Sequence, residues 1–289
     1  MKVAIIGGSG KMGRWFARFL LQDGQEVVIC GRNEKKLRAA GRELEVKVAS
    51  MVDAIQVADA VLLSVSVESF EEVVAQISPH ISPGQVVVDI TSLKVFPVAT
   101  MHKYLKGARM LGTHPLFGPG AANVANQNFV LTPTSDGERT LAQKVREYLE
   151  ARGARISLMT PAEHDEKMAV VLGLAHFIAI ISADTLINTD RLKQTEAVGG
   201  ITYKVLLTLV ESVVSENPEL YASLQMTLPD MVGIEAVFHR KVTEWADLVK
   251  NKNRPEFIRR MNVLKDKLRE DSPDFGQAYQ NMYRLAAER

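Results

Sequence analysis

The chain has 289 residues, 46% hydrophobic and 24% charged, so it is long and apolar enough to form two folded domains. A formal net charge of +1 argues against the strongly basic surface typical of nucleic-acid or anionic-membrane binding, and we expect neither partner. The single cysteine, Cys30, excludes an internal disulfide framework and predicts a reducing, cytoplasmic location.

No segment of the sequence predicts a membrane anchor. The first apolar run ends at Gly7, which leaves it too short for the apolar region of a signal peptide. The longest apolar stretch, residues 168–183, is interrupted by Gly173, His176 and Ser182. We therefore expect a buried helix there and a soluble protein.

The first 160 residues alternate between short apolar strands and helices. Residues 2–6 are mostly β-branched, as expected for a parallel strand buried on both faces. A glycine-rich turn, a helix at 14–23, a strand at 26–30 and another helix follow. Further strands are predicted at 60–66, 85–90, 109–113, 129–132 and 155–158, and further helices at 70–77, 95–105 and 140–152. This alternation predicts parallel βαβ units and hence an α/β fold with a doubly wound, Rossmann-type parallel sheet.

The pattern changes after Thr160, which is suited to cap a helix with Pro161 in its first turn. From there the chain is predicted to be helical, with breaks near residues 188–200, 217–218, 229 and 254–255. We predict a dinucleotide-binding domain at 1–160 and an all-helical domain at 161–289. The apolar run at 205–214 indicates core or subunit interface, and we expect the helical domain to form a homodimer.

The turn after the first strand has the pattern Gly8-x-Gly10-x-x-Gly13 and opens a helix, which is the context of a dinucleotide site. Gly8 is expected to permit the tight turn, Gly10 to let the backbone approach a pyrophosphate, and Gly13 to let helix and strand pack closely. The helix N-terminus offers free N–H groups to phosphates. The predicted cofactor contacts in this turn are Gly8, Ser9, Gly10, Lys11, Met12 and Gly13.

The end of the second strand indicates which nicotinamide cofactor binds. An acidic residue there binds the ribose 2′-hydroxyl of NAD, whereas arginine accommodates the 2′-phosphate of NADP. This chain has Arg32 there, with Lys35 and Lys36 beyond it and no carboxylate before Glu34. Either these cations bind a phosphate or they form a solvated helix start. We predict NADP, with NAD as the alternative, and add Ser64 to the cofactor contacts.

Two segments follow strands at the edge where ligands bind in such sheets. One contains Ser92, and the other places His114 before Pro115 in a stiff loop. Histidine accepts a proton near neutral pH, which the oxidation of an alcohol requires. Ser92 is expected to orient that imidazole or to bind a substrate hydroxyl. The alternative is a turn histidine and a capping serine with no shared ligand.

At these residues the sequence resembles the prephenate dehydrogenase family. Its His114-Pro-Leu-Phe-Gly-Pro119 is similar to the family's catalytic-histidine loop, and Asp89-x-x-Ser92-x-Lys94 to its serine segment. Later matching motifs are Glu163-His164-Asp165, His176-Phe177, Tyr203-Lys204 and Asn217-Pro-Glu-Leu-Tyr221. The resemblance covers nearly the whole chain, with weaker detail after about Met226.

The resemblance implies hydride transfer from C4 of prephenate to the nicotinamide, then loss of CO₂ to give 4-hydroxyphenylpyruvate in tyrosine biosynthesis. His114 takes the hydroxyl proton and Ser92 assists. His164, Tyr203 and Lys204 are the implied substrate contacts, although His164 at a helix start can also cap or pair locally. No metal is expected, since His164 and His176 lie too far apart in sequence for a helical ligand pair.

One position departs from the family pattern. Where the family has an arginine that binds a substrate carboxylate, this chain has Ser212, preceded by Glu211. Either another cation replaces it (Lys204, Arg191 or Arg240) or the substrate differs. The alternatives to prephenate are therefore arogenate, an amino-substituted prephenate, or no reaction at all in a nucleotide-binding regulator.

Overall fold

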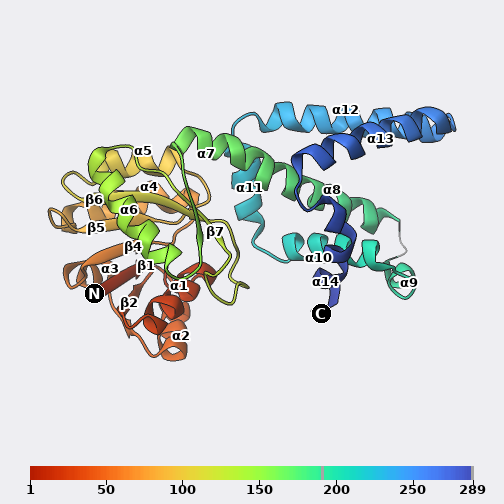
Figure 1. Cartoon of the computed structure of the whole chain (residues 1–289). Coiled ribbons are helices and arrows are strands. Elements are labelled where there is room, and N and C mark those ends of the chain that lie inside the picture. Colours follow the sequence, from red (N-terminus) through yellow and green to blue (C-terminus); the bar gives the residue numbers. More distant parts are fainter. Residues whose placement is uncertain (190–191, 288–289) are drawn as a thin grey trace. The chain divides into compact units, whose positions relative to one another are not determined.

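The computed structural model describes residues 1–189 and 192–287 and divides into two compact units, Met1–Lys167 and Met168–Arg289 (Figure 1). The first unit contains an eight-stranded sheet, and the described part of the second is helical. This is the expected α/β sheet followed by helices. The boundary between the compact units lies beyond Thr160, and the domain assignment of 1–160 and 161–289 stays a prediction.

The sheet is doubly wound, with strand order β3-β2-β1-β4-β5-β6-β7-β8. The order reverses between β1 and β4, which is the switch point where such sheets bind ligands. At that point Ile6 of β1 pairs with Cys30 of β2 on one side and Leu63 of β4 on the other. The strands are β1 (Lys2–Ile6), β2 (Glu26–Cys30), β3 (Lys47–Val48), β4 (Ala60–Leu63), β5 (Val86–Asp89), β6 (Arg109–Pro115), β7 (Asn128–Leu131) and β8 (Arg155–Leu158).

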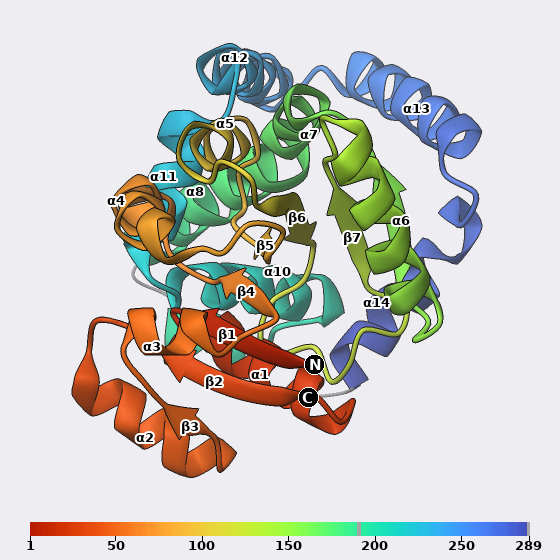
Figure 2. The ribbon, with the colours of Figure 1, turned by 90° about the vertical axis from the view of Figure 1, so that its left-hand side faces the viewer.

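Helices cover both faces of the sheet because successive strand residues point to opposite sides. In β1, Ala4 and Ile6 pack with α3, α4 and α5, whereas Val3 and Ile5 pack with α1 and α2. Helix α6 covers β6 and β7 on the opposite face from α4 and α5 (Figure 2). The helices are α1 (Lys11–Gln22), α2 (Glu34–Leu44), α3 (Met51–Gln56), α4 (Val67–Ile77), η1 (Ser78–His80), α5 (Val95–Tyr104), α6 (Asp136–Glu150) and α7 (Pro161–Met168).

Three features of this unit differ from the sequence prediction. Strand β7 runs antiparallel to β6, with His114 opposite Val130, although an all-parallel sheet is predicted. The connection at residues 116–127 contains no helix, and a parallel crossover needs one. Strand β3 and helix α3 are also unpredicted, because two strand residues are too few to show a periodicity.

The second unit contains a π-helical segment and eight further helical elements in its described part. Leu207 and Val210 of α10 are buried in its core, and Met231 of α12 packs against Gly173. Pro218 and Pro255 lie in first turns of helices, where proline is tolerated. The elements are η2 (Ala169–Leu174), α8 (Ala175–Asn188), α9 (Leu192–Glu196), α10 (Ile201–Val214), α11 (Pro218–Thr227), α12 (Met231–Lys250), α13 (Arg254–Asp271), η3 (Phe275–Gln277) and α14 (Ala278–Ala287).

The helix Pro161–Asn188 is long and apolar enough, by length and composition alone, to cross a membrane. Only 17% of its most apolar window is buried inside the protein. Val170, Val171 and Ile187 each expose more than half of their surface. Within the segment 168–183 the expected burial is met in part, since Met168, Ala169, Gly173, Ala179 and Ala183 are buried whereas Val170, Val171 and Ile181 are exposed.

The close packing expected at Gly13 is confirmed. A Cβ atom there would lie 2.4 Å from the carbonyl oxygen of Gly7 and 2.9 Å from the Cα of Gly8, both backbone atoms that cannot move aside. Gly137, in the first turn of α6, has no atom within 4 Å of the same position. The two glycines therefore differ in steric surroundings, although both lie near helix starts.

We expect Gly13→Ala to lower the free energy of unfolding by about 1–3 kcal/mol, because the new methyl group separates α1 from β1. Gly137→Ala is the matched control and should leave stability unchanged or raise it by up to about 1 kcal/mol. Urea denaturation measures both. Equal midpoints for the two variants would contradict the close contact.

Candidate active site

The loop from β1 to α1 forms a backbone cradle at the switch point. The N–H groups of Gly7 and Gly8 both donate to the Cys30 carbonyl, at 2.9 and 3.1 Å. Gly7, with φ of +85°, makes the tight turn that was predicted for Gly8. Gly8 instead permits close approach to β2, since a Cβ atom there would lie 2.5 Å from that of Ile29. Gly10 is the N-cap of α1 and supplies no side-chain hydrogen bond to it, and a helix N-terminus of this kind suits a phosphate.

The other predicted cofactor residues lie around this cradle. Ser9 and Met12 are half-buried, and Lys11 is exposed. Ser64 follows β4 directly, and its N–H donates to the Ile6 carbonyl at 2.9 Å. Ser64 and the glycine loop therefore both lie at the switch point, and their contacts with a cofactor stay a prediction.

Basic side chains follow the end of β2. Arg32, Lys35 and Lys36 are all exposed. Asn33 uses its side chain to cap α2, accepting from the N–H of Lys36 at 2.9 Å. No carboxylate lies between Cys30 and Glu34, so the cations at this helix start meet no acidic residue at the strand end.

A chain of buried polar side chains starts at His114. His114 lies within β6 and is 5% exposed, so the predicted loop position is wrong: pairing with β7 extends the strand past it. Its Nδ1 lies 2.8 Å from Nε2 of His164, which is fully buried. Nδ1 of His164 lies 2.6 Å from Oδ1 of Asp165. The three side chains therefore form one hydrogen-bonded line.

Asp165 anchors this line to the start of α5. Its Oδ1 accepts from the N–H of Lys94 at 2.8 Å, and its Oδ2 accepts from the N–H of Val95 at 2.9 Å. Both donors belong to the N-terminal end of that helix, where a negative charge is stabilised. The carboxylate thus bridges the His164 ring and the backbone that follows Ser92.

A second buried ion pair lies next to this line. Lys94 and Asp89 have side chains with no exposed surface, and the Lys94 ammonium donates to Asp89 Oδ2. Lys94 also donates to the Thr91 hydroxyl at 3.3 Å, and Asp89 Oδ1 accepts from the Thr91 N–H at 2.8 Å. Burial lowers the pKa of Lys94, and the Asp89 carboxylate opposes that shift. The two buried charges are tolerated in the core because the ammonium and the carboxylate neutralise each other.

Both histidines are disposed to be neutral. Burial holds the pKa of His114 well below its usual value, and the neighbouring His164 and Lys94 lower it further. Burial also lowers the pKa of His164, although its bond to Asp165 opposes that shift. A carboxylate only accepts, so His164 keeps its proton on Nδ1 and its Nε2 accepts from His114 Nδ1. This leaves His114 Nε2 as a bare acceptor, to which nothing hydrogen-bonds in residues 1–189 and 192–287.

The predicted site residues of this unit have different surroundings. Ser92 lies half-buried in the turn before Lys94 and makes no hydrogen bond to His114 in the described chain. His164 is predicted to contact substrate, but both of its ring nitrogens are engaged within the protein.

The sequence analysis assigns no role to Asp89, Lys94 or Asp165. The sequence does offer a signal for these three residues, since they belong to the two family-like motifs that contain Ser92 and His164.

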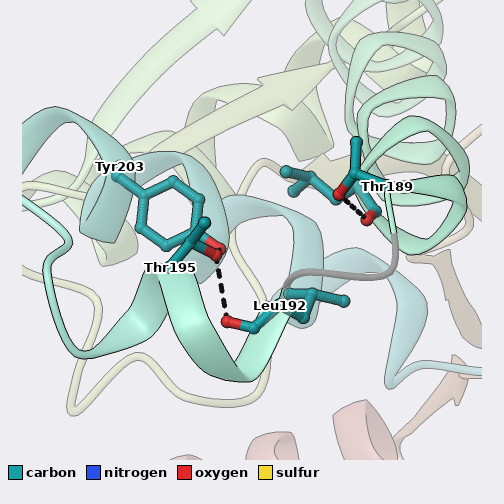
Figure 3. Close-up of a pocket in the computed structure, with 5 residues that line it drawn as sticks. Thr189, Leu192, Thr195 and Tyr203 are labelled. Carbon is teal, nitrogen blue, oxygen red and sulfur yellow. Dashed lines mark hydrogen bonds between the residues drawn. The ribbon is translucent and has the colours of Figure 1, made fainter.

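The remaining predicted residues belong to the second unit. Tyr203 lines a cavity of about 480 Å³, and its hydroxyl lies 2.9 Å from the Thr195 hydroxyl (Figure 3). Lys204 is exposed on α10, and Ser212 is exposed with its hydroxyl donating to the Leu209 carbonyl. Arg191 lies outside the described residues.

His176 is half-buried on α8 in the same unit. Its ring packs edge-to-face on Tyr221, with centroids 4.9 Å apart, and its Nδ1 is buried without a hydrogen-bond partner in the described chain. Burial lowers the pKa of His176. The two motifs that contain these residues are therefore in contact, as neighbouring parts of one helical unit.

Two family descriptions match the chain. Residues 16–158 match "Prephenate dehydrogenase, nucleotide-binding domain", and residues 160–263 match "Prephenate dehydrogenase, dimerization domain". The probable arogenate/prephenate dehydrogenase of Methanocaldococcus jannaschii is 32% identical over 266 residues, covering 90% of this chain and 59% of that protein. The T-protein of Haemophilus influenzae is 26% identical over 266 residues, covering 92% and 66%. The chain thus spans less than two thirds of the length of these relatives.

Solved structures share the fold at lower identity. Prephenate dehydrogenase from A. aeolicus, in complex with hydroxyphenyl propionate and NAD⁺, has a TM-score of 0.76 and 23% identity, covering 94% of this chain and 98% of that one. Synechocystis arogenate dehydrogenase has a TM-score of 0.67 and 22% identity, covering 92% and 99%. These similarities establish a common architecture for both units.

We expect Lys94→Met to lower the free energy of unfolding by about 3–5 kcal/mol, because it leaves the Asp89 carboxylate buried without its cation. Lys103→Met is the matched control, since Lys103 pairs with Glu71 at the surface and should have little effect. Chemical denaturation at neutral pH compares the two variants. Similar stabilities would show that the Asp89–Lys94 pair is not held as described.

Proposed function

Because the chain belongs to the prephenate dehydrogenase family, we propose that it oxidises prephenate with NADP as the hydride acceptor. The observation that carries this proposal is the bare Nε2 of a buried, neutral His114 at the carboxyl edge of the sheet. A neutral imidazole fixed in one tautomer is a ready proton acceptor. The glycine cradle lies at the switch point of the same sheet.

The first step separates a hydride and a proton. A bound nicotinamide supplies the hydride acceptor for C4 of prephenate. His114 Nε2 accepts the proton of the C4 hydroxyl as the carbonyl forms, so the histidine gains one positive charge. Ser92, in the turn after β5, is proposed to hold the same hydroxyl in place.

The second step returns that proton. Loss of CO₂ from the ring leaves its electron pair to aromatise the dienone, and the former carbonyl oxygen becomes a phenolate. The His114 imidazolium then donates its proton to this oxygen and gives 4-hydroxyphenylpyruvate. No proton is gained or lost over the cycle, so a deeply buried base is sufficient.

A second candidate keeps the chemistry and changes the substrate to arogenate or an amino-substituted prephenate. Ser212 favours it, since this position offers no cation to a carboxylate and Glu211 precedes it. The names of two relatives include arogenate/prephenate and 4-amino-4-deoxyprephenate. Turnover on prephenate, arogenate and the amino analogue separates these substrates. No reduced cofactor with any of them would favour a nucleotide-binding regulator.

The residues present fit a dinucleotide. At Gly10, the N-cap of α1, an added Cβ atom would meet only the Gly7 carbonyl oxygen, at 3.2 Å, and the N-cap supplies no side-chain hydrogen bond. Exposed Arg32 supports NADP over NAD, because a guanidinium binds a phosphate through paired donors. Gly8, Gly10, Gly13, Arg32 and Ser64 are the proposed contacts, with Ser9, Lys11 and Met12 in the same loop.

We expect His114→Asn to reduce kcat by roughly 10²–10⁴-fold while NADP still binds, because only the proton acceptor is lost. In the unaltered protein, activity should persist as pH falls below 6.5 and decline only at lower pH. The sign follows from the lowered pKa of His114, which keeps its neutral form populated in more acidic solution. Steady-state kinetics across pH, with cofactor binding measured separately, provide the test. An acidic limb above pH 6.5 would contradict it.

We expect Arg32→Ala to raise the KM for NADP by roughly 10–100-fold and to leave the KM for NAD nearly unchanged, since only the 2′-phosphate contact is removed. Arg42→Ala, on the last turn of the helix α2 that follows Arg32, is the control and should alter neither constant. A preference for NAD in the unaltered protein would overturn the assignment of NADP.

We propose that the second unit forms a homodimer. The matching family description names a dimerization domain, and the helix Pro161–Asn188 exposes Val170, Val171, Ile181 and Ile187 in one chain. A dimeric mass is expected in solution scattering at micromolar concentration, and a monomeric mass would contradict the dimer.

The proposed location is a reducing cytoplasm. Cys30, the only cysteine, is buried and unpaired, which supports this location.

A further inference from the structure

We propose that Asp165 is a positioning residue that fixes the tautomer of His114 and stabilises the positive charge that His114 gains during turnover. It acts through His164, which lies between them. This inference rests on the proposed function for its kinetic consequence. Its structural part, the order of the protons along the line, can be tested without any substrate.

The hydrogen bonds to Asp165 fix the proton positions. Among the described residues, two backbone N–H groups and the Nδ1–H of His164 donate to this carboxylate. A carboxylate cannot donate back, so the His164 proton has one permitted position. The His114 proton is then required on Nδ1, facing His164 Nε2. If His164 held its proton on Nε2 instead, two acceptors would face each other at 2.6 Å, and the substrate-facing nitrogen of His114 would carry the proton.

Buried charges surround the two histidine rings. The charged groups around the two rings are Asp89, Lys94 and Asp165, with side chains 0–8% exposed. Lys94 and Asp89 neutralise each other as an ion pair, so Asp165 is left with one uncompensated negative charge. Proton transfer to His114 makes the buried cluster neutral. Through His164, Asp165 therefore offsets part of the cost that burial and Lys94 impose on a positive charge at His114.

Asp165 also links the start of α5 to the histidine pair. Asp165 binds the N–H groups of Lys94 and Val95, directly after the segment that carries Ser92. The same carboxylate holds His164 against His114. Asp165 therefore connects the end of the serine segment, which it contacts at the Lys94 N–H, to the catalytic imidazole, which it reaches only through His164.

The test compares three single variants. Asp165→Asn removes the charge and turns an N–H group toward a backbone N–H. His164→Gln keeps a side-chain carbonyl that can accept from His114 but breaks the line to Asp165. Glu163→Gln is the matched control, because this neighbouring carboxylate is exposed and, within the described residues, accepts from the N–H and hydroxyl of Thr160 and not from the histidine line. Melting temperature and NADP affinity, measured for each, identify any variant that fails to fold.

We expect Asp165→Asn and His164→Gln to lower kcat by roughly 10²-fold or more, with a smaller change in KM. The acidic limb of kcat/KM should move to lower pH, because the carboxylate raises the pKa of His164 and its removal makes the ring pair harder to protonate. Glu163→Gln should change neither quantity. A loss of kcat with an unmoved acidic limb in both variants would reduce Asp165 to a structural role and overturn the proposal.

Nitrogen-15 NMR of the imidazole rings, recorded without substrate, gives the independent measurement. The expected spectrum has a bare Nε2 and a protonated Nδ1 on His114, assigned with His114→Asn, and a mixture of tautomers after Asp165→Asn. A protonated Nε2 in the unaltered protein would overturn the proposal even if prephenate is oxidised. The converse result is a protein that shows the expected tautomer and yet oxidises none of the substrates. That result would contradict the proposed function but support the proposed order of protons along the line.

Discussion

The carboxylate of Asp165 is the group on which the arrangement of the site depends. It is buried, and an isolated charge in that position is strongly unfavourable. Two helix N–H groups and one imidazole N–H compensate for the lost water. The two backbone donors open α5, and the imidazole donor lies beside Asp165 in α7 and is itself bonded to His114 of β6, so this carboxylate links α5, α7 and β6 within the first unit.

The sheet explains why these elements meet. In a doubly wound sheet the strands end at one edge, so residues far apart in sequence become neighbours there. Asp89 ends β5, and the Thr113 hydroxyl of β6 donates to its carbonyl at 2.7 Å. Pairing with the antiparallel strand β7 continues β6 as a regular strand past His114, so that residue belongs to the sheet itself. A histidine in a strand has less freedom than one in a loop, and its tautomer can therefore be enforced by a single partner.

Much of this could be predicted from the sequence. The β-branched run at Lys2–Ile6, the glycines that follow and the alternation of elements predict the sheet, and the structure confirms it. The orientation of β7 could not be predicted, since periodicity carries no direction. His114 was identified by its type and position, whereas Asp165 was missed because a carboxylate beside a histidine near a helix start is usually a surface pair. Its burial arises from contacts with Lys94, 71 residues away, which no local pattern records.

The buried charges also explain how one site can serve both halves of the proposed reaction. A base that must release its proton to water needs access to solvent, but a base that returns the proton to the product does not. His114 is 5% exposed, and its partner His164 is fully buried. Lys94 lowers the pKa of His114, whereas Asp165 raises the pKa of the adjoining His164. These opposing effects suit a proton that His114 accepts and returns within one turnover, whether the substrate ring carries a keto acid or an amino acid side chain.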